Sequence, residues 1–120
     1  MKIAGIGFRS GATIGSVLDA MERAGATGLR RLAVPAAKRD DPLVSELIAQ
    51  GFEVTPIPQE ALARIATPTQ SRISLQVYGT GSVAEACALA AGANSRLLVA
   101  RVVSADRMAT AALAETGENS

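Results

Sequence analysis

The sequence predicts a single α/β domain, built as a three-layer α/β/α sandwich around a mixed, mostly parallel sheet of about five strands that ends in an antiparallel hairpin. Two observations predict this fold. Short apolar runs alternate with segments whose apolar residues recur at helical spacing, which favours parallel strands joined by helices on both faces of a sheet. The last two apolar runs are separated by residues 104–107, a connection short enough for a hairpin.

The first half of the chain is expected to contain two strand–helix units and a third strand. Thr13 is a typical cap for the first helix, and Gly25 is a typical stop. Asp41 and Pro42 have the residue types that begin a helix, and Gly51 ends this second one. The strands of this half are predicted at residues 2–6, 29–34 and 52–57.

The second half is expected to contain helices followed by the hairpin. The predicted elements are a short helix over 58–65, an alanine-rich helix over 83–91, and strands at 96–103 and 108–113. Residues 71–78 fit either a strand or one to two helical turns, because apolar and polar residues alternate there. The domain is therefore placed at residues 1–115, with 116–120 as a polar, frayed tail.

The composition excludes several classes of function. The net charge is +1 and aromatic residues make up 2% of the chain, so neither nucleic acid nor a membrane is expected as a partner. Histidine is absent and Cys87 is the one cysteine, which removes histidine-dependent catalysis and thiolate metal sites and favours the reducing cytoplasm. Asp40 and Asp41 are more typical of a helix start than of a metal site. No cofactor, metal or catalytic residue is predicted.

Two glycine-hydroxyl segments are the main functional signal. GIGFRSGAT (Gly5 to Thr13) follows the first apolar run, and GTGSVAEACALAAG (Gly79 to Gly92) leads into the alanine-rich helix. Glycine permits a sharp turn close to a ligand, and the N–H groups at a helix start attract anions. A dinucleotide site is weakly supported, because Ser10 stands where the third glycine of the fingerprint belongs and no acidic residue ends the second strand.

Candidate ligand-binding residues come from these two segments and from the loop after the second strand. Arg9 offers a guanidinium beside a helix start, although an exposed arginine in a turn explains it equally well. Lys38 would lie at the same edge of the sheet, but a solvated charge run is the commoner explanation. The candidates are Gly7, Arg9, Ser10, Gly11, Lys38, Gly79, Thr80, Gly81 and Ser82.

Two further residues have structural explanations. Ser82 and Glu85 match the capping box S-x-x-E, which accounts for both side chains without catalysis. Cys87 lies among alanines with no neighbouring base, so it is predicted to be a small packing residue.

Taken together, the motifs resemble the CobE/CbiG C-terminal-domain family of cobalamin (vitamin B12) biosynthesis. The resemblance covers nearly the whole chain, and SVAEACAL is its most specific part. The matching segments are GIGFRSG at Gly5 to Gly11, Lys38 with Asp40-Asp41, GTGSVAEACAL at Gly79 to Leu89, and LLVAR at Leu97 to Arg101. Two departures stand out: Phe8 replaces a cysteine that is frequent in the family, and aspartate replaces the usual glutamate after the lysine.

The resemblance implies a protein that binds or carries a corrinoid or precorrin intermediate through its carboxylate arms. The length favours the stand-alone CobE branch of the aerobic route over the longer CbiG proteins, which are associated with opening a lactone on a precorrin ring. A hydrolase using Asp40, Asp41 or Glu85 is the alternative. A third possibility is an interaction protein that docks on other pathway enzymes through the alanine-rich helix or an edge strand.

Overall fold

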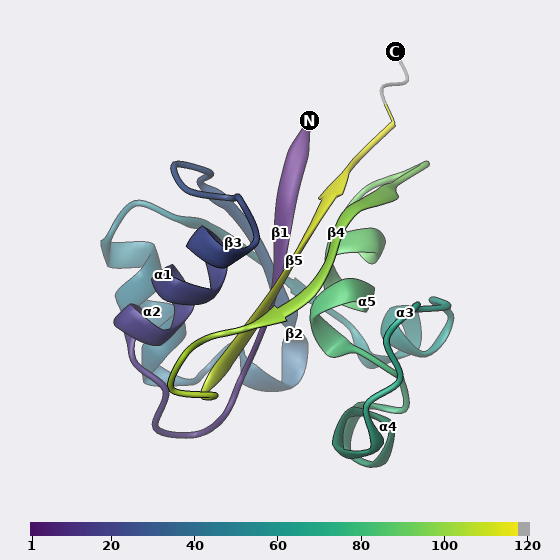
Figure 1. Ribbon diagram of the computed structural model, residues 1–120, viewed down its shortest axis with the longest axis horizontal. Coiled ribbons are helices and arrows are strands. Elements are labelled where there is room, and N and C mark those ends of the chain that lie inside the picture. Colours follow the sequence, from purple (N-terminus) through teal and green to yellow (C-terminus); the bar gives the residue numbers. More distant parts are fainter. Residues whose placement is uncertain (118–120) are drawn as a thin grey trace.

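The computed structural model describes residues 1–117 and contains a five-stranded sheet with helices on both faces (Figure 1). The strands are β1 (Lys2–Phe8), β2 (Arg31–Pro35), β3 (Glu53–Ile57), β4 (Arg96–Val103) and β5 (Ala109–Glu115). The helices are α1 (Ile14–Arg23), the 3-10 turn η1 (Ala36–Lys38), α2 (Pro42–Ala49), α3 (Gln59–Ala63), α4 (Arg72–Tyr78) and α5 (Val83–Ala90). None of the helices in this range is long and apolar enough to cross a membrane.

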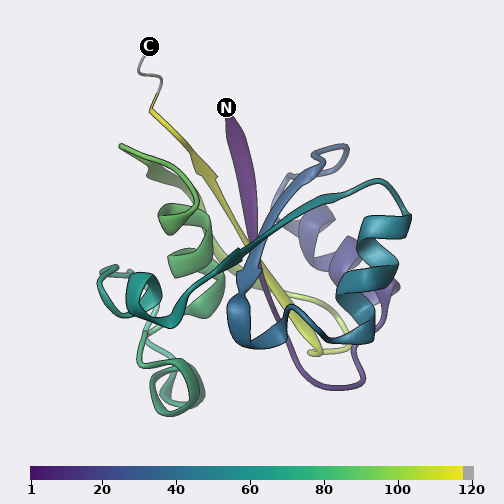
Figure 2. The same cartoon turned by 180° about the vertical axis from the view of Figure 1, so that it is seen from behind.

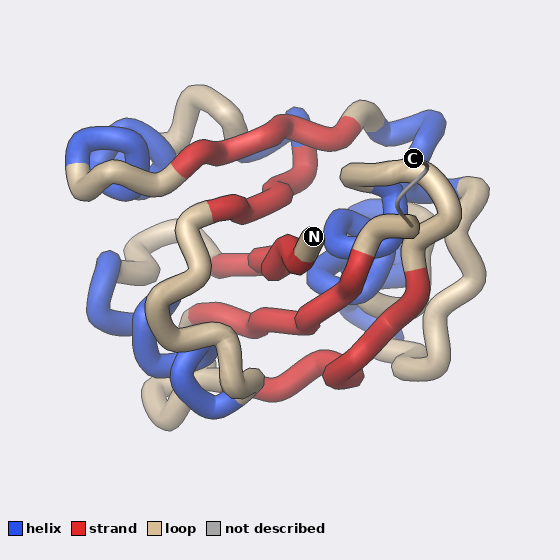
Figure 3. Tube along the Cα trace, turned by 90° about the horizontal axis from the view of Figure 1, so that it is seen from above, coloured by secondary structure: helices blue, strands red, loops and turns tan. Residues whose placement is uncertain are grey.

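The sheet has the strand order β3-β2-β1-β5-β4. β1, β2 and β3 are parallel, whereas β5 runs antiparallel to both β1 and β4. β4 and β5 form the C-terminal hairpin. Figure 3 shows the strands of this sheet from above, with helices on either side. The predicted fold class, an α/β sandwich with a mixed sheet and an antiparallel hairpin, is therefore confirmed.

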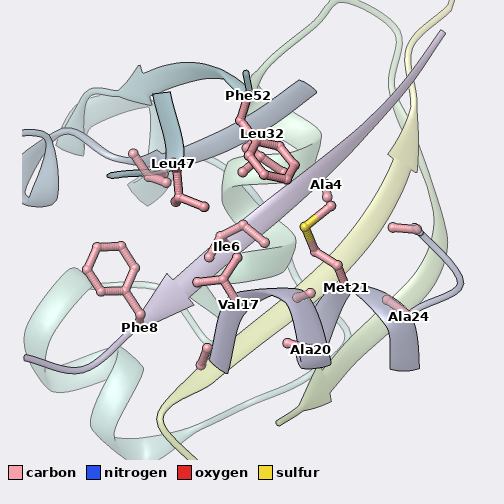
Figure 4. Close-up of a cluster of buried hydrophobic side chains, with 14 of the residues drawn as sticks. Ala4, Ile6, Phe8, Val17, Ala20, Met21, Ala24, Leu32, Leu47 and Phe52 are labelled. Carbon is pink, nitrogen blue, oxygen red and sulfur yellow. The ribbon is translucent and has the colours of Figure 1, made fainter. Parts of the chain in front are cut away.

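The helices divide between the two faces of the sheet. α1 and α2 pack on one face, around a core of large apolar side chains (Figure 4). α5 and α3 pack on the other face, around a smaller core that includes Cys87 (Figure 2). α4 lies beside α3 at the periphery of the molecule (Figure 1). The chain therefore crosses the sheet twice on one face and returns along the other.

β1 separates large from small residues between its two faces. Ile6 and Phe8 point into the α1 and α2 core (Figure 4). Gly5 and Gly7 face α5 on the other side of the strand. A Cβ at Gly5 would lie 1.9 Å from the carbonyl oxygen of Ala84 and 2.5 Å from the nitrogen of Ala88. The backbone of α5 thus lies directly on that of β1, which no larger residue at position 5 would permit.

This packing corrects the interpretation of Gly5 and Gly7 as turn residues. Both glycines lie inside β1, which continues to Phe8 instead of ending at Ile6 as predicted. The glycines serve the contact between strand and helix, and the turn begins only at Arg9. Sequence alone did not show this, because G-x-G is equally typical of a phosphate-binding turn.

Residues 72–78 form a helix, α4, which decides the alternative left open by the sequence. The side-chain oxygen of Ser71 accepts a hydrogen bond from the nitrogen of Ser74, and Gly79 ends the helix in the left-handed region with φ 70°. Two of the alternating apolar residues, Ile73 and Val77, are exposed in this helix, at 62% and 63% of their full area. The alternation therefore does not reflect a buried face. A helix that packs weakly carries no burial pattern that sequence analysis can detect.

The start of the predicted C-terminal tail is attached to the fold. The nitrogen of Thr116 donates a hydrogen bond to the carbonyl of Met1, and the nitrogen of Gly117 donates to that of Ala93. The prediction of a frayed tail is therefore wrong for these two residues, whose N–H groups extend the pairing beyond β5. Residues 118–120 of that predicted tail lie outside the described residues.

Candidate functional site

A cavity of about 330 Å³ opens where β1 ends and the β4–β5 hairpin turns. The end of β1 contributes Gly7 and Phe8, followed by Arg9, while β4 contributes Arg101 and Val103, and the hairpin contributes residues 107–110. The helical side is formed by α4 with its cap Ser71, and by the first residue of α5. The volume is at the lower end of the range for small-molecule sites, so the cavity accommodates a small ligand or one edge of a larger one.

Three arginines border this cavity. Arg9 follows β1, Arg101 lies on β4, and Arg107 lies in the hairpin loop. Within residues 1–117, none of their guanidinium groups forms an ion pair or a side-chain hydrogen bond. None of the described residues that line the cavity is Asp or Glu. The site therefore has an uncompensated positive charge in a geometry that suits carboxylate or phosphate oxygens.

The cavity also has an apolar wall. Its main side chains are Ile73 and Tyr78 of α4, Val83 of α5 and Met108 of the hairpin. Burial, followed by the nearby Cys87 thiol, raises the pKa of the Tyr78 hydroxyl, so Tyr78 is neutral near pH 7. A ligand with both a hydrophobic body and an anionic edge matches the two walls.

Ser74 provides an unpartnered hydroxyl in this cavity. Ser74 is only 8% exposed, and its Oγ has no hydrogen-bond partner among the described residues. An unpartnered buried hydroxyl is uncommon in a folded protein, because burial without a partner destabilises the fold. The hydroxyl is therefore available to a bound ligand.

The buried carboxylate of Glu85 connects two sides of the cavity. It accepts hydrogen bonds from the nitrogen of Thr69 (3.0 Å), the hydroxyl of Thr69 (2.6 Å) and the nitrogen of Arg101 (2.7 Å). A bulge between Val99 and Val102 of β4 interrupts the pairing with β5 there. Glu85 thus fixes both the bulge that carries Arg101 and the loop that leads into α4.

This arrangement corrects the capping-box interpretation of Ser82 and Glu85. The Ser82 hydroxyl does accept a hydrogen bond from the nitrogen of Glu85, at 3.3 Å. The Glu85 side chain, however, does not return to the helix start but bonds Thr69 and Arg101. The S-x-x-E motif predicted the Ser82 cap correctly and the partner of Glu85 wrongly. The spacing of the motif is the same whether the glutamate bonds the helix start or a distant segment.

A network of hydrogen bonds holds the hairpin loop. The Asp106 carboxylate accepts from the hydroxyls of Ser104 and Ser16, both at 2.6 Å, and from the nitrogen of Met108 at 3.0 Å. These bonds, that of Ser104 first, hold the pKa of Asp106 below its usual value. Asp19 of α1 adds a bond from the nitrogen of Ala105. The loop next to the cavity is thereby fixed against α1.

The same network also contacts the start of α1, which follows the first glycine segment. Thr13 and Ser16 form a complete capping box at the start of α1, and the carboxylate of Asp106 contacts Ser16. The Asp106 carboxylate therefore lies beside the start of α1, where the helix dipole favours a negative charge. Arg9 lines the cavity, whereas Ser10 and Gly11 lie in the turn outside it, with Gly11 at φ 91°.

Lys38 does not join Arg9 in the cavity. Its Nζ lies 5.1 Å from the centroid of the Phe8 ring, a cation–π contact. Phe8 belongs to the core shared with α1 and α2 and also lines the cavity, so Lys38 contacts a lining residue without lining the cavity itself. The neighbouring Asp41 caps α2 by accepting a hydrogen bond from the nitrogen of Leu43 at 2.9 Å. Among the described residues, no cluster of three metal-ligating side chains is present.

Val83 of the second glycine segment lines the cavity, whereas residues 79–82, which precede it, do not. Thr80 and Ser82 are buried, at 3% and 1% exposure, and Gly79 is the left-handed cap of α4. A Cβ at Gly81 would lie 2.5 Å from the carbonyl oxygen of Thr69. Residues 79–82 therefore join α4 to α5 in little space, and the buried Thr80 hydroxyl has no hydrogen-bond partner among the described residues.

Sequence reasoning identified Gly7 and Arg9 among the lining residues and missed Arg101, Arg107 and Ser74. Arg101 was quoted only as part of a family motif, because strand arginines are commonly solvent-facing. The hairpin arginine had one local signal, its place in a tight connection beside Asp106. Ser74 gave no signal, since the state of its segment was undecided.

Comparison with known proteins agrees with the motifs. The family described as "Cobalamin synthesis G C-terminus" matches residues 2–114. The chain belongs to this family. The CbiG C-terminal family therefore places it among the proteins of cobalamin biosynthesis, which confirms the resemblance inferred from the sequence.

Two solved structures resemble this member of the CbiG C-terminal family. One is the crystal structure at 1.7 Å resolution of CobE, a protein from the cobalamin (vitamin B12) biosynthetic pathway, with 30% identity, a TM-score of 0.84, and coverage of 100% of this chain and 93% of the other. The second is cobalamin biosynthesis protein chiG from Agrobacterium tumefaciens str. C58, with 29% identity, a TM-score of 0.71, and coverage of 98% and 100%. No curated protein sequence matches the chain significantly.

Proposed function

We propose that this protein binds a corrinoid or precorrin intermediate of cobalamin biosynthesis and holds it by its carboxylate arms in the cavity at the end of β1. The observation that carries the proposal is a set of three arginines, Arg9, Arg101 and Arg107, which have no ion-pair partner among the described residues and share the cavity with an apolar wall. Family membership indicates the pathway from which the ligand comes, and the cavity-lining residues indicate which groups of the ligand are bound.

The arginines account for recognition of the arms. Precorrin and corrin acids are polycarboxylates around an apolar ring, and a guanidinium binds a carboxylate through two parallel hydrogen bonds. A hydrogen bond to a charged group contributes about 1.5–3 kcal/mol when it is shielded from water. Arg101 is half-buried, whereas Arg9 and Arg107 are exposed, so Arg101 is expected to contribute most.

The apolar wall accounts for contact with the ring. Ile73 is 62% exposed although it lines the cavity, and covering it with a ring edge removes apolar area from water. The cavity is too small to enclose a tetrapyrrole, so we propose that one edge enters and the rest stays accessible. Such a complex suits a protein that passes its ligand to the next enzyme of the pathway.

The hydrolase alternative has little support from the site. It needs a carboxylate base beside the ligand, and the lining residues within 1–117 include none. Glu85 is fully buried and already accepts three hydrogen bonds, and Asp41 caps α2. Docking of a partner through α5 has no support either, because residues 83–88 of that helix are buried. A cytoplasmic location stays a prediction.

The test is a titration of the protein with a metal-free corrin polycarboxylic acid, followed by the visible spectrum of the ring. We expect saturable binding at micromolar concentrations, weakened about tenfold or more by Arg101→Ala, which corresponds to about 1.4 kcal/mol. Lys38→Ala makes the same charge change outside the cavity and is expected to bind as the unaltered protein does. Equal affinities for the two variants would contradict the site.

A matched pair on α4 tests the apolar wall. Ile73 and Val77 are equally exposed, but only Ile73 is among the lining residues within 1–117. Ile73→Ser should weaken binding of the corrin acid several-fold, because it removes ring contact, whereas Val77→Ser should have no effect. A loss of affinity in both variants would indicate an effect on α4 as a whole.

A further inference from the structure

Arg107 has a backbone conformation that arginine rarely adopts. Its φ is 63°, in the left-handed region, and Asn94 is the other non-glycine residue there within residues 1–117. Asparagine tolerates this region because its short side chain bonds locally, and glycine has no Cβ to clash. Arginine has neither advantage, so its presence at this φ destabilises the folded state relative to glycine.

The hairpin loop imposes this conformation on Arg107. The nitrogen of Arg107 donates to the carbonyl of Ser104 at 2.9 Å, and Asp106 holds the residues on either side. The loop is in turn fixed to α1 through Ser16. The turn geometry therefore does not depend on the Arg107 side chain, which makes no hydrogen bond or ion pair within the described residues and lines the cavity.

We propose that Arg107 is a specificity-determining residue, kept at a strained position because its guanidinium binds an anionic group of the ligand in this cavity. Strained residues that the surrounding structure over-determines are concentrated at binding sites. Two independent features support a ligand here: the unpartnered Ser74 hydroxyl, and the absence of an acidic partner among the described lining residues. The inference rests on the proposed function only for the identity of the ligand, since an anion of another kind would contact the same guanidinium.

The test compares Arg107→Gly with the unaltered protein for both stability and binding. Glycine relieves the strain, so we expect the melting temperature to stay the same or rise by a few °C. At the same time, the dissociation constant for a metal-free corrin polycarboxylic acid should rise about tenfold or more. Arg107→Lys should retain an intermediate affinity, because it keeps the charge and loses the paired hydrogen bonds.

Asn94→Gly is the matched control, since it makes the same kind of backbone change at a residue that does not line the cavity. It should leave binding unchanged. Unchanged corrin-acid affinity in Arg107→Gly would overturn the proposal, as would a clear loss of stability, which would show that the side chain supports the fold.

A second probe, citrate, separates this inference from the proposed function. If citrate stabilises the protein through Arg107 but the corrin acid does not bind, the inference holds and the proposed function fails. If the corrin acid binds equally with and without Arg107, the proposed function holds and the inference fails. If neither probe binds, both are overturned.

Discussion

A single missing side chain, at Gly5, sets the distance between α5 and the sheet. Gly5→Ala would place a Cβ 1.9 Å from the backbone oxygen of Ala84, and a backbone atom cannot turn aside as a flexible side chain can. We expect a loss of about 3 kcal/mol or more in the free energy of unfolding, at the upper end of overpacking effects. Urea denaturation measures it.

Gly15→Ala is the control for that substitution. Gly15 lies in α1, and a Cβ there would lie 3.5 Å from the Thr13 hydroxyl, an ordinary contact. Because alanine favours a helix, stability should rise by about 0.5–1 kcal/mol. If both substitutions had the same small effect, close packing of α5 on β1 would not be the reason for Gly5.

Residue types predicted local structure better than they predicted the site. The caps at Thr13, Asp41 and Ser82 were predicted correctly, because a cap depends on neighbours within three residues. Arg101 and Ser74 reach the cavity through a bulge and a peripheral helix. Their positions depend on contacts between distant segments, which no local pattern records.

At the scale of elements, the loop of the β4–β5 hairpin is attached to α1 by the carboxylates of Asp106 and Asp19, in addition to the apolar core that the hairpin strands share with α1. The folded-state pKa of Asp106 lies below the usual value because Ser104, Ser16 and the nitrogen of Met108 donate to the ionised form. A lowered folded pKa stabilises the protein above the unfolded value of 3.8, and this contribution is lost as pH falls through the folded pKa. Acid is therefore expected to weaken the attachment of the hairpin loop to α1.

Asp106→Asn tests this attachment. The variant should be less stable than the unaltered protein at pH 7, and the difference should shrink as the pH falls below about 4, where the native carboxylate is itself protonated. Denaturant unfolding at pH 7 and pH 3 gives the comparison. Asp40→Asn, the same change on an exposed residue, is the control. A difference that does not depend on pH would contradict the role of the ionised carboxylate.

The elements themselves were largely predictable. α1 and α2 were predicted from their caps and stops, and the hairpin from its short connection. α4 was not decided, because its exposed Ile73 and Val77 give no buried face. Some strand boundaries differ from the prediction because a turn occupies the predicted end of the strand. β2 begins at Arg31 and not at residue 29, because the nitrogen of Leu29 donates to the carbonyl of Ala26 in a turn.

At the scale of the whole molecule, the sheet brings together charges that are distant in sequence. Arg9, Arg101 and Arg107 meet because β5 lies between β1 and β4 in the sheet. The net charge of the chain, +1, gives no indication that three arginines gather at one site. The fold class follows from the pattern of elements, whereas the cavity follows from the strand order, which the sequence left unspecified.

The most direct test of the account is a calorimetric titration with two ligands that share one ring. One is a metal-free corrin polycarboxylic acid, and the other is the same ring with its carboxylates converted to amides. We predict that the acid binds at micromolar concentrations, that high salt weakens its binding, and that the amide binds at least about tenfold more weakly. Equal binding of both ligands, or binding of neither, would contradict recognition of the arms by arginine.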